Sequence, residues 1–196
     1  LAAVLYAMYW FVGILGAGQN EPLPPSQEDY WHHAAPLSLL LVRTGIFVAI
    51  YWLLTLYYFG FGFSFYSIPR LANLTELHLV ILPFLLSATL LGVCLGAILP
   101  RRELATLLVL LSSIPIVFVS GFICPIAAIP APLVAMSQMV PVVPAIRAFL
   151  ALNQMGADFA DILPLWKQLW LCTGLYGLVA LWLLRRQYSR TVVRQT

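Results

Sequence analysis

The sequence is poor in charged residues. Asp, Glu, Lys and Arg make up 9% of the 196 residues, whereas hydrophobic residues make up 62%. Soluble proteins carry about 25% charged residues, so this composition excludes a soluble domain and indicates a membrane protein. The net charge of +3 is small. Because the arginines lie at the edges of apolar runs rather than on one basic face, nucleic-acid binding is not predicted.

Acidic residues are absent from the interior of the apolar runs. Glu76, Glu103, Asp158 and Asp161 all lie at the ends of these runs. A proton-coupled carrier normally needs an ionisable group within the membrane, and an aspartyl protease would need its acids there. The sequence therefore argues against a carrier that powers itself. If the protein moves a substrate, we expect the energy to come from another chain.

The motifs of several enzyme classes are also absent. The sequence has no G-x-x-x-x-G-K-[ST] loop, no G-x-S-x-G and no H-E-x-x-H. Its three cysteines form no Cys-x-x-Cys or His/Cys cluster, so neither a metal, a cofactor nor a disulfide is predicted. We interpret the cysteines as packing residues and His78 as a polar residue at the membrane edge. The chain is not predicted to be an enzyme.

The sequence does contain five apolar runs, each near or above the length of about 20 residues that crosses a bilayer. We predict an all-α, polytopic transmembrane bundle. Its expected parts are a truncated transmembrane helix at 1–17, a cytoplasmic loop at 18–36, three transmembrane helices in 37–122 (about 37–61, 77–99 and 104–122), an external re-entrant segment at 123–162, a last transmembrane helix at 163–186 and a cytoplasmic tail at 187–196. Because 1–17 is short for a span, we expect the chain to be part of a longer protein.

Prolines interrupt the segment 123–162, which follows Ser120-Gly121-Phe122. They are Pro125, Pro130, Pro132, Pro141 and Pro144. Proline breaks helices, and lipid cannot satisfy the backbone groups that are freed. We therefore expect two short helices, at about Pro132 to Met139 and Pro144 to Asn153. The segment should dip into the outer leaflet and return without crossing.

The basic residues predict the orientation in the membrane. If the last four arginines are cytoplasmic, alternation of the spans places Arg43, Arg101 and Arg102 there too, which gives seven of the ten basic residues. The loop 18–36 is then cytoplasmic and the proline-rich segment faces outward.

A short helix is predicted in that loop, from Gln27 to about Ala34. Ser26 is a good N-cap, and the acids Glu28 and Asp29 suit the positive start of a helix. Tyr30 and Trp31 stand in its middle. Two interpretations fit these aromatic residues equally well. They are either an anchor at the lipid headgroups or the contacts of a helix that docks on a cytoplasmic partner.

Taken together, these segments resemble the type-2 ABC exporter permeases. The resemblance rests on Ser120-Gly121-Phe122 followed by Pro125, on the segment Met139 to Gly156, and on Leu99 to Glu103 with its Arg-Arg-Glu turn. Tyr57-Tyr58-Phe59-Gly60 is similar to the branch often encoded beside a membrane fusion protein. The resemblance covers Val42 to Leu184.

The resemblance implies a multi-pass permease subunit of the bacterial inner membrane, which exports a hydrophobic or amphipathic substrate. It implies ABC ATPase subunits and a second permease copy, identical or not, as partners in the lipid bilayer, with a membrane fusion protein as a further candidate partner. The helix in the loop 18–36, with Glu28, Asp29, Tyr30 and Trp31, would contact the ATPase. The missing parts would be a first helix and an external domain.

The same resemblance suggests a substrate pathway along the run 104–122, because this helix lines the cavity in the family. The candidate pathway residues are Ser112, Ser113, Phe118 and Phe122. Each also fits a packing role, and the two serines precede Pro115, whose freed carbonyl they are placed to satisfy. The alternative function is a membrane scaffold that anchors a periplasmic partner without transport. An intramembrane enzyme is disfavoured by the missing motifs.

Overall fold

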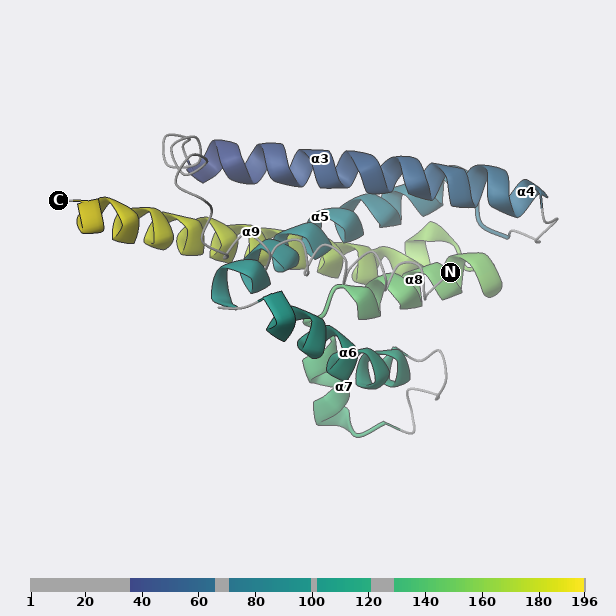
Figure 1. Ribbon diagram of the computed structural model, residues 1–196. Helices are drawn as coiled ribbons and strands as arrows, with labels where there is room; N and C mark the ends of the chain where they lie inside the picture. The colour runs from purple at the N-terminus through teal and green to yellow at the C-terminus, as the bar shows by residue number, and fades with distance from the viewer. Residues whose placement is uncertain (1–35, 66–70, 100–101, 121–128, 196) are drawn as a thin grey trace.

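The computed structural model describes residues 36–65, 71–99, 102–120 and 129–195, and every regular element in these ranges is a helix. The elements are α3 (Pro36–Leu56), the π-helix η2 (Tyr57–Gly62), α4 (Phe63–Phe65), α5 (Leu74–Ile98), α6 (Arg102–Val119), α7 (Ala131–Ser137), α8 (Val142–Gln154) and α9 (Phe159–Gln195). The predicted all-α class is confirmed (Figure 1).

Three of the described helices are long and apolar enough to cross a membrane. They are Leu40–Gly62, Leu74–Ile98 and Phe159–Arg186. A fourth span results if α7 and α8, which are bent by 95° at the break between them, are counted as one. The predicted count of five is therefore not confirmed. The expected span 1–17 lies outside the described residues. Most of the run 104–122 belongs to α6, which ends at Val119 and is not among the three.

Helix α5 is the central element. In its apolar 18-residue window, 72% of the residues are buried, compared with 22% for the window in the span of α3 and 17% for that in α9. This helix runs parallel to α9, because Leu79 meets Trp166, Pro83 meets Thr173 and Leu90 lies beside Gly177. The two helices therefore begin at the same end of the bundle.

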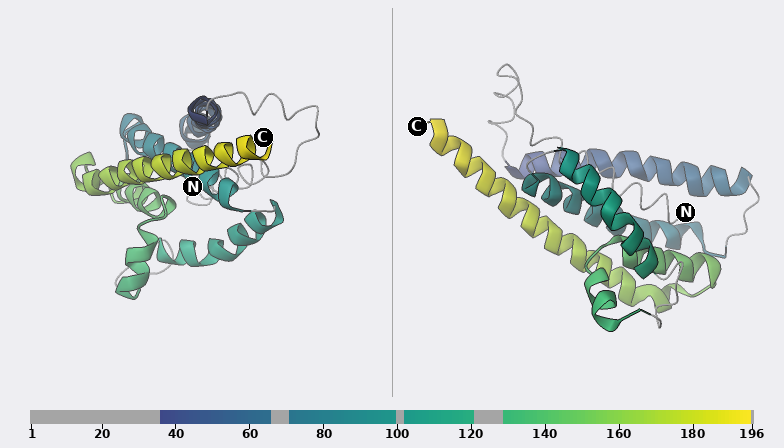
Figure 2. Two further views of the ribbon diagram at one scale, coloured as in Figure 1. Left: turned by 90° about the vertical axis from the view of Figure 1, so that its left-hand side faces the viewer. Right: turned by 60° about the horizontal axis from the view of Figure 1, so that its bottom comes forward.

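Helix α3 runs antiparallel to α5 and α9 and covers both. Near its start, Leu40 packs with Val93 and Ala180, and near its end Tyr51 shares the main core with Leu77 and Phe149. Figures 1 and 2 show this layer of three long helices, with α8 beside it and with α6 and α7 standing apart. Among the described elements, α6 packs chiefly against α7.

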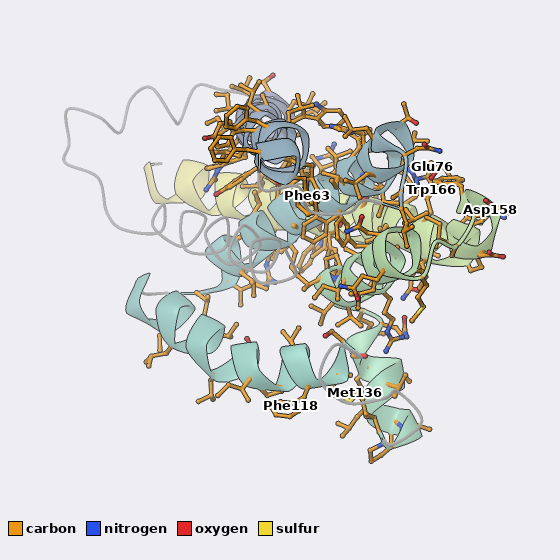
Figure 3. All side chains as sticks on the ribbon, turned by 90° about the vertical axis from the view of Figure 1, so that its right-hand side faces the viewer. Phe63, Glu76, Phe118, Met136, Asp158 and Trp166 are labelled. Atoms are coloured by element: carbon orange, nitrogen blue, oxygen red, sulfur yellow. The ribbon has the colours of Figure 1, made fainter. Side chains whose placement is uncertain are left out.

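The two ends of the bundle differ in charge. At one end α6 begins at Arg102 and α9 carries the exposed Arg185 and Arg186, with the guanidinium of Arg186 5.3 Å from the ring centre of Trp182. We call this the basic end. At the opposite end, called the acidic end, lie Glu76, Asp158 and Asp161; Figure 3 labels the first two near Trp166.

Aromatic residues line the π-helix at the end of α3. Tyr57 stacks on Phe61 with ring centres 5.5 Å apart, and Phe61 stacks on Phe65 at 5.7 Å, so these three form an exposed ladder. On the other side Phe59, which is 3% exposed, meets Phe149 of α8 at 5.2 Å. Aromatic residues four apart thus stack along one face, as they also can on an α-helix, while Phe59 reaches the core.

A proline inside α5 is compensated by α9. Pro83 has no N–H, so it leaves the carbonyl of Leu79 without its helical partner. The indole N–H of Trp166 donates to that oxygen over 2.9 Å, and the hydroxyl of Thr173 donates to the oxygen of Pro83 over 3.1 Å. These two hydrogen bonds at the proline break therefore set the register of α9 along α5.

This contact predicts the effect of changing Trp166. Trp166→Phe keeps a ring but removes the donor, and an unmet carbonyl at this place should lower the free energy of unfolding by about 0.5–2 kcal/mol. Unfolding in mixed detergent and denaturing micelles, followed by circular dichroism, measures it. Trp182→Phe is the matched control, because Trp182 is exposed and a phenyl ring still accepts Arg186. Equal losses in the two variants would contradict the assignment.

Candidate functional site

The break between α7 and α8 is the candidate site. Helix α7 begins after Pro130, whose oxygen accepts the amides of Leu133 and Val134 at 3.0 and 3.2 Å. Helix α8 begins after Pro141, whose oxygen accepts the amide of Ala145 at 3.3 Å. Proline suits the first turn of a helix because the missing N–H would have no partner there. The prolines thus start both helices, and the chain turns by 95° between them.

This corner is held by a stripe of polar side chains on α9. Gln168 Nε2 donates to both the backbone oxygen and Oε1 of Gln138, each over 2.8 Å. Two turns further along α9, the hydroxyl of Tyr176 donates to the backbone oxygen of Met139. Cys172, halfway between, has its Sγ 4.0 Å from the same oxygen. Spacing of four residues puts all three on one face of α9, where they satisfy backbone groups that lipid could not.

The second half of the broken segment is part of the core. Eight residues of α8 are buried, and Val142, Val143, Ala148 and Leu152 are completely so. In contrast, α7 has no buried residue. The two predicted short helices are thus confirmed to within about two residues at each end, and they differ in how firmly they are held.

Two of the four predicted pathway residues, Ser112 and Phe118, have described side chains, and they lie on different faces of α6. Ser112 Oγ donates to the backbone oxygen of Leu108 over 2.6 Å, which is not the carbonyl freed by Pro115, that of Leu111. Phe118 is six residues further, about 120° around α6. It is 45% exposed, and Figure 3 shows it on the side of α6 that faces away from the bundle. The side chain of Ser113 and the whole of Phe122 lie outside the described residues.

The predicted coupling residues Glu28, Asp29, Tyr30 and Trp31 also lie outside the described residues. Within the described part of the chain, no group of three or more His, Cys, Asp or Glu residues is placed to hold a metal. Cys94 and Cys172 are buried free thiols, as expected for packing residues. The Nδ1–H of His78 donates to the oxygen of Leu74 over 2.6 Å, and its ring lies beside Trp52 at 5.5 Å.

Reasoning from the sequence missed the residues that support the break in α5, the corner between α7 and α8, and the end of α6. They are Trp166, Gln168, Thr173 and Tyr176 on α9, and Arg147 on α8, whose Nη2 donates to the oxygen of Val119 over 3.2 Å. A usable signal was present, because Gln168, Cys172 and Tyr176 recur every four residues in an otherwise apolar run. Polar groups inside spanning helices usually bind neighbouring helices or line a pathway.

The comparisons with known proteins agree with the fold. A model of the family described as "ABC-2 family transporter protein" matches residues 33–182, which confirms the resemblance that the sequence carried. No curated protein and no solved structure matches the chain. The match begins before α3 and ends within α9, so it covers all three long apolar helices and the broken pair. The chain therefore belongs to the ABC-2 transporter family and is a multi-pass membrane subunit of an ABC transporter.

Proposed function

We propose that the chain is the permease of an ATP-driven exporter in the bacterial inner membrane. Separate ATPase subunits bind its cytoplasmic loop, and a second permease copy completes the pathway for a hydrophobic or amphipathic substrate. ATP binding brings the ATPase subunits together, the helix Gln27 to Ala34 transmits the movement, and the bundle alternates between inward and outward access.

The observation that carries this proposal is the break itself. Inside the membrane, interrupted helices are tolerated where they line a cavity or are buried in protein, and in transporters they commonly form the site of passage. Here α7 and α8 are interrupted, and their free backbone groups are met by α9. Between Leu77 and Ile98 the central helix has no Asp, Glu, Lys or Arg, which supports an energy source on another subunit.

The parallel course of α5 and α9 supports the proposed topology. Two parallel spans cross in the same direction, so one net crossing in the opposite direction must lie between them. Only α6 and the α7–α8 pair are available in the described chain between α5 and α9. If α6 crosses the membrane, the α7–α8 pair has to enter and leave the membrane on the same side. The basic end of the bundle is then the cytoplasmic end.

Labelling of single cysteines tests this orientation. In a variant without native cysteines, Asn73→Cys should react with an impermeant thiol reagent in intact cells. Asn20→Cys and Gln195→Cys should react only after the membrane is opened. Asn73 is exposed beside the acidic end, just before α5. Labelling of Gln195→Cys but not of Asn73→Cys in intact cells would reverse the topology.

The site of ATP hydrolysis is tested by purification. We expect the chain alone to release no phosphate from ATP above a mock-purified control, because its sequence lacks a phosphate-binding loop. The same preparation with its ATPase subunits should release phosphate in a manner sensitive to vanadate. Hydrolysis by the chain alone would refute a separate energy source.

The coupling helix is tested by truncating its aromatic residues. Tyr30→Ala with Trp31→Ala should leave expression and membrane insertion near normal. The double variant should lower the amount of copurified ATPase and abolish export, because buried aromatic anchors often contribute about 2 kcal/mol or more to binding. Replacing Glu28 and Asp29 by Ala should reduce ATPase binding and export as well, but by less than the double aromatic variant does.

The comparison is made at matched amounts of permease. Normal ATPase binding and export in the double aromatic variant would mean that this loop is only an interfacial anchor. Retained ATPase binding without any export in the parent protein would instead favour the non-transporting scaffold.

A further inference from the structure

The broken segment divides the described bundle into a fixed part and an arm. Helix α8 is buried against α5 and α9, and the corner at Gln138 and Met139 is bonded to α9. Helices α6 and α7 form the arm, which all three figures show standing clear of the long helices. On α6, Leu111 and Ile114 are 83% and 66% exposed. Among the described residues, few contacts therefore fix where the arm lies.

Arg147 provides a side-chain contact between the end of this arm and the fixed part. It stands on α8 between Ile146 and Ala148, which are 1% and 0% exposed, so its backbone position is set by the core. Its Nη2 donates to the oxygen of Val119 over 3.2 Å. Val119 is the last residue of α6. The two residues are 28 positions apart in the sequence, and their hydrogen bond joins α6 directly to α8.

An arginine suits this position for two physical reasons. The last carbonyls of a helix have no partner within it, and the helix dipole makes that end negative, so a cation is favoured there. Arg147 supplies both a donor and a positive charge. Its Nε is shielded from solvent and has no hydrogen-bond partner among the described residues. The guanidinium thus has unused donor capacity and is held chiefly through the end of α6.

We propose that Arg147 is a positioning residue that latches the end of α6 to α8, and that the arm α6–α7 moves about the corner at Gln138 to Pro141 when this latch opens. The movement of the arm rests on the proposed function, since ATP would have to drive it. The hydrogen bond between Arg147 and the end of α6 does not depend on that function. Because Ser120 follows Val119 directly and is 1% exposed, release of the latch uncovers Ser120.

Alkylation of a cysteine at position 120 measures the latch in membranes that contain the full chain. Ser120→Cys is placed in a background in which Cys94, Cys124 and Cys172 are Ala, and its reaction with N-ethylmaleimide is timed. Arg147→Gln, added to this variant, should raise the rate at least fivefold, because the reaction follows the population of the opened form. Arg147→Lys should stay within threefold of the parent, because a single donor to one carbonyl can be supplied by an ammonium group.

Two controls separate a latch from general loosening. Ser87→Cys is the matched reporter, since Ser87 is a serine of α5 that is 0% exposed, and its rate should not change with Arg147→Gln. Lys167→Gln removes an exposed cation of α9 and should leave the rate at position 120 unchanged. An equal rise at both reporters, or no rise at position 120, overturns the proposal.

Trapping the complex with ATP and vanadate tests the movement. In the parent protein, trapping should change the rate at position 120 by at least threefold. In Arg147→Gln it should change the rate by less, because the latch is already open. An unchanged parent rate in a complex that shows vanadate-sensitive hydrolysis makes Arg147 a permanent tie and overturns the movement. Absence of such hydrolysis contradicts the proposed function, and the variants without nucleotide still decide whether Arg147 positions α6.

Discussion

A carbonyl oxygen without a donor is the constraint on which this structure depends. Pro83 frees the oxygen of Leu79 in the most buried helix, and in hydrocarbon no water can replace the missing partner. The indole of Trp166 meets it and so sets how α9 lies along α5. With that register fixed, Gln168 and Tyr176 stand opposite the corner between α7 and α8. One proline thus determines where the second break of the chain is supported.

The same requirement recurs at the corner between α7 and α8 and at the end of α6, and in all three places the supporting side chain comes from another helix. The break in α5 and the corner are supported from α9, and the end of α6 is supported from α8. Direct bonds to α9 make the first two permanent parts of the bundle. The third depends on one flexible arginine. A transporter needs both kinds of support, because part of it has to keep its shape while another part moves.

The sequence is sufficient to predict the elements but not their partners. Apolar length gives α3, α5 and α9, and the prolines give α7 and α8 closely, because both signals act locally along the chain. No local sequence pattern indicates that α5 and α9 are neighbours. The carbonyl groups to which Trp166 and Tyr176 donate could therefore not be predicted. For the same reason the sequence does not tell which face of α6 Ser112 or Phe118 occupies. A resemblance to a family can indicate which helix lines the pathway. Which face of that helix points inward depends on the helices that pack against it.

Helix α9 is 37 residues long, which corresponds to about 55 Å at 1.5 Å per residue. The hydrocarbon layer is only about 30 Å thick, so a large part of this rod stands in the aqueous phase on the side of Arg185 and Arg186. A rod clamped at the corner acts as a lever with unequal arms. A small tilt near Gln168 becomes a displacement of several ångströms at its far end. A movement at the corner between α7 and α8 would therefore reach the basic end through the rigidity of α9, without a chain of intervening contacts.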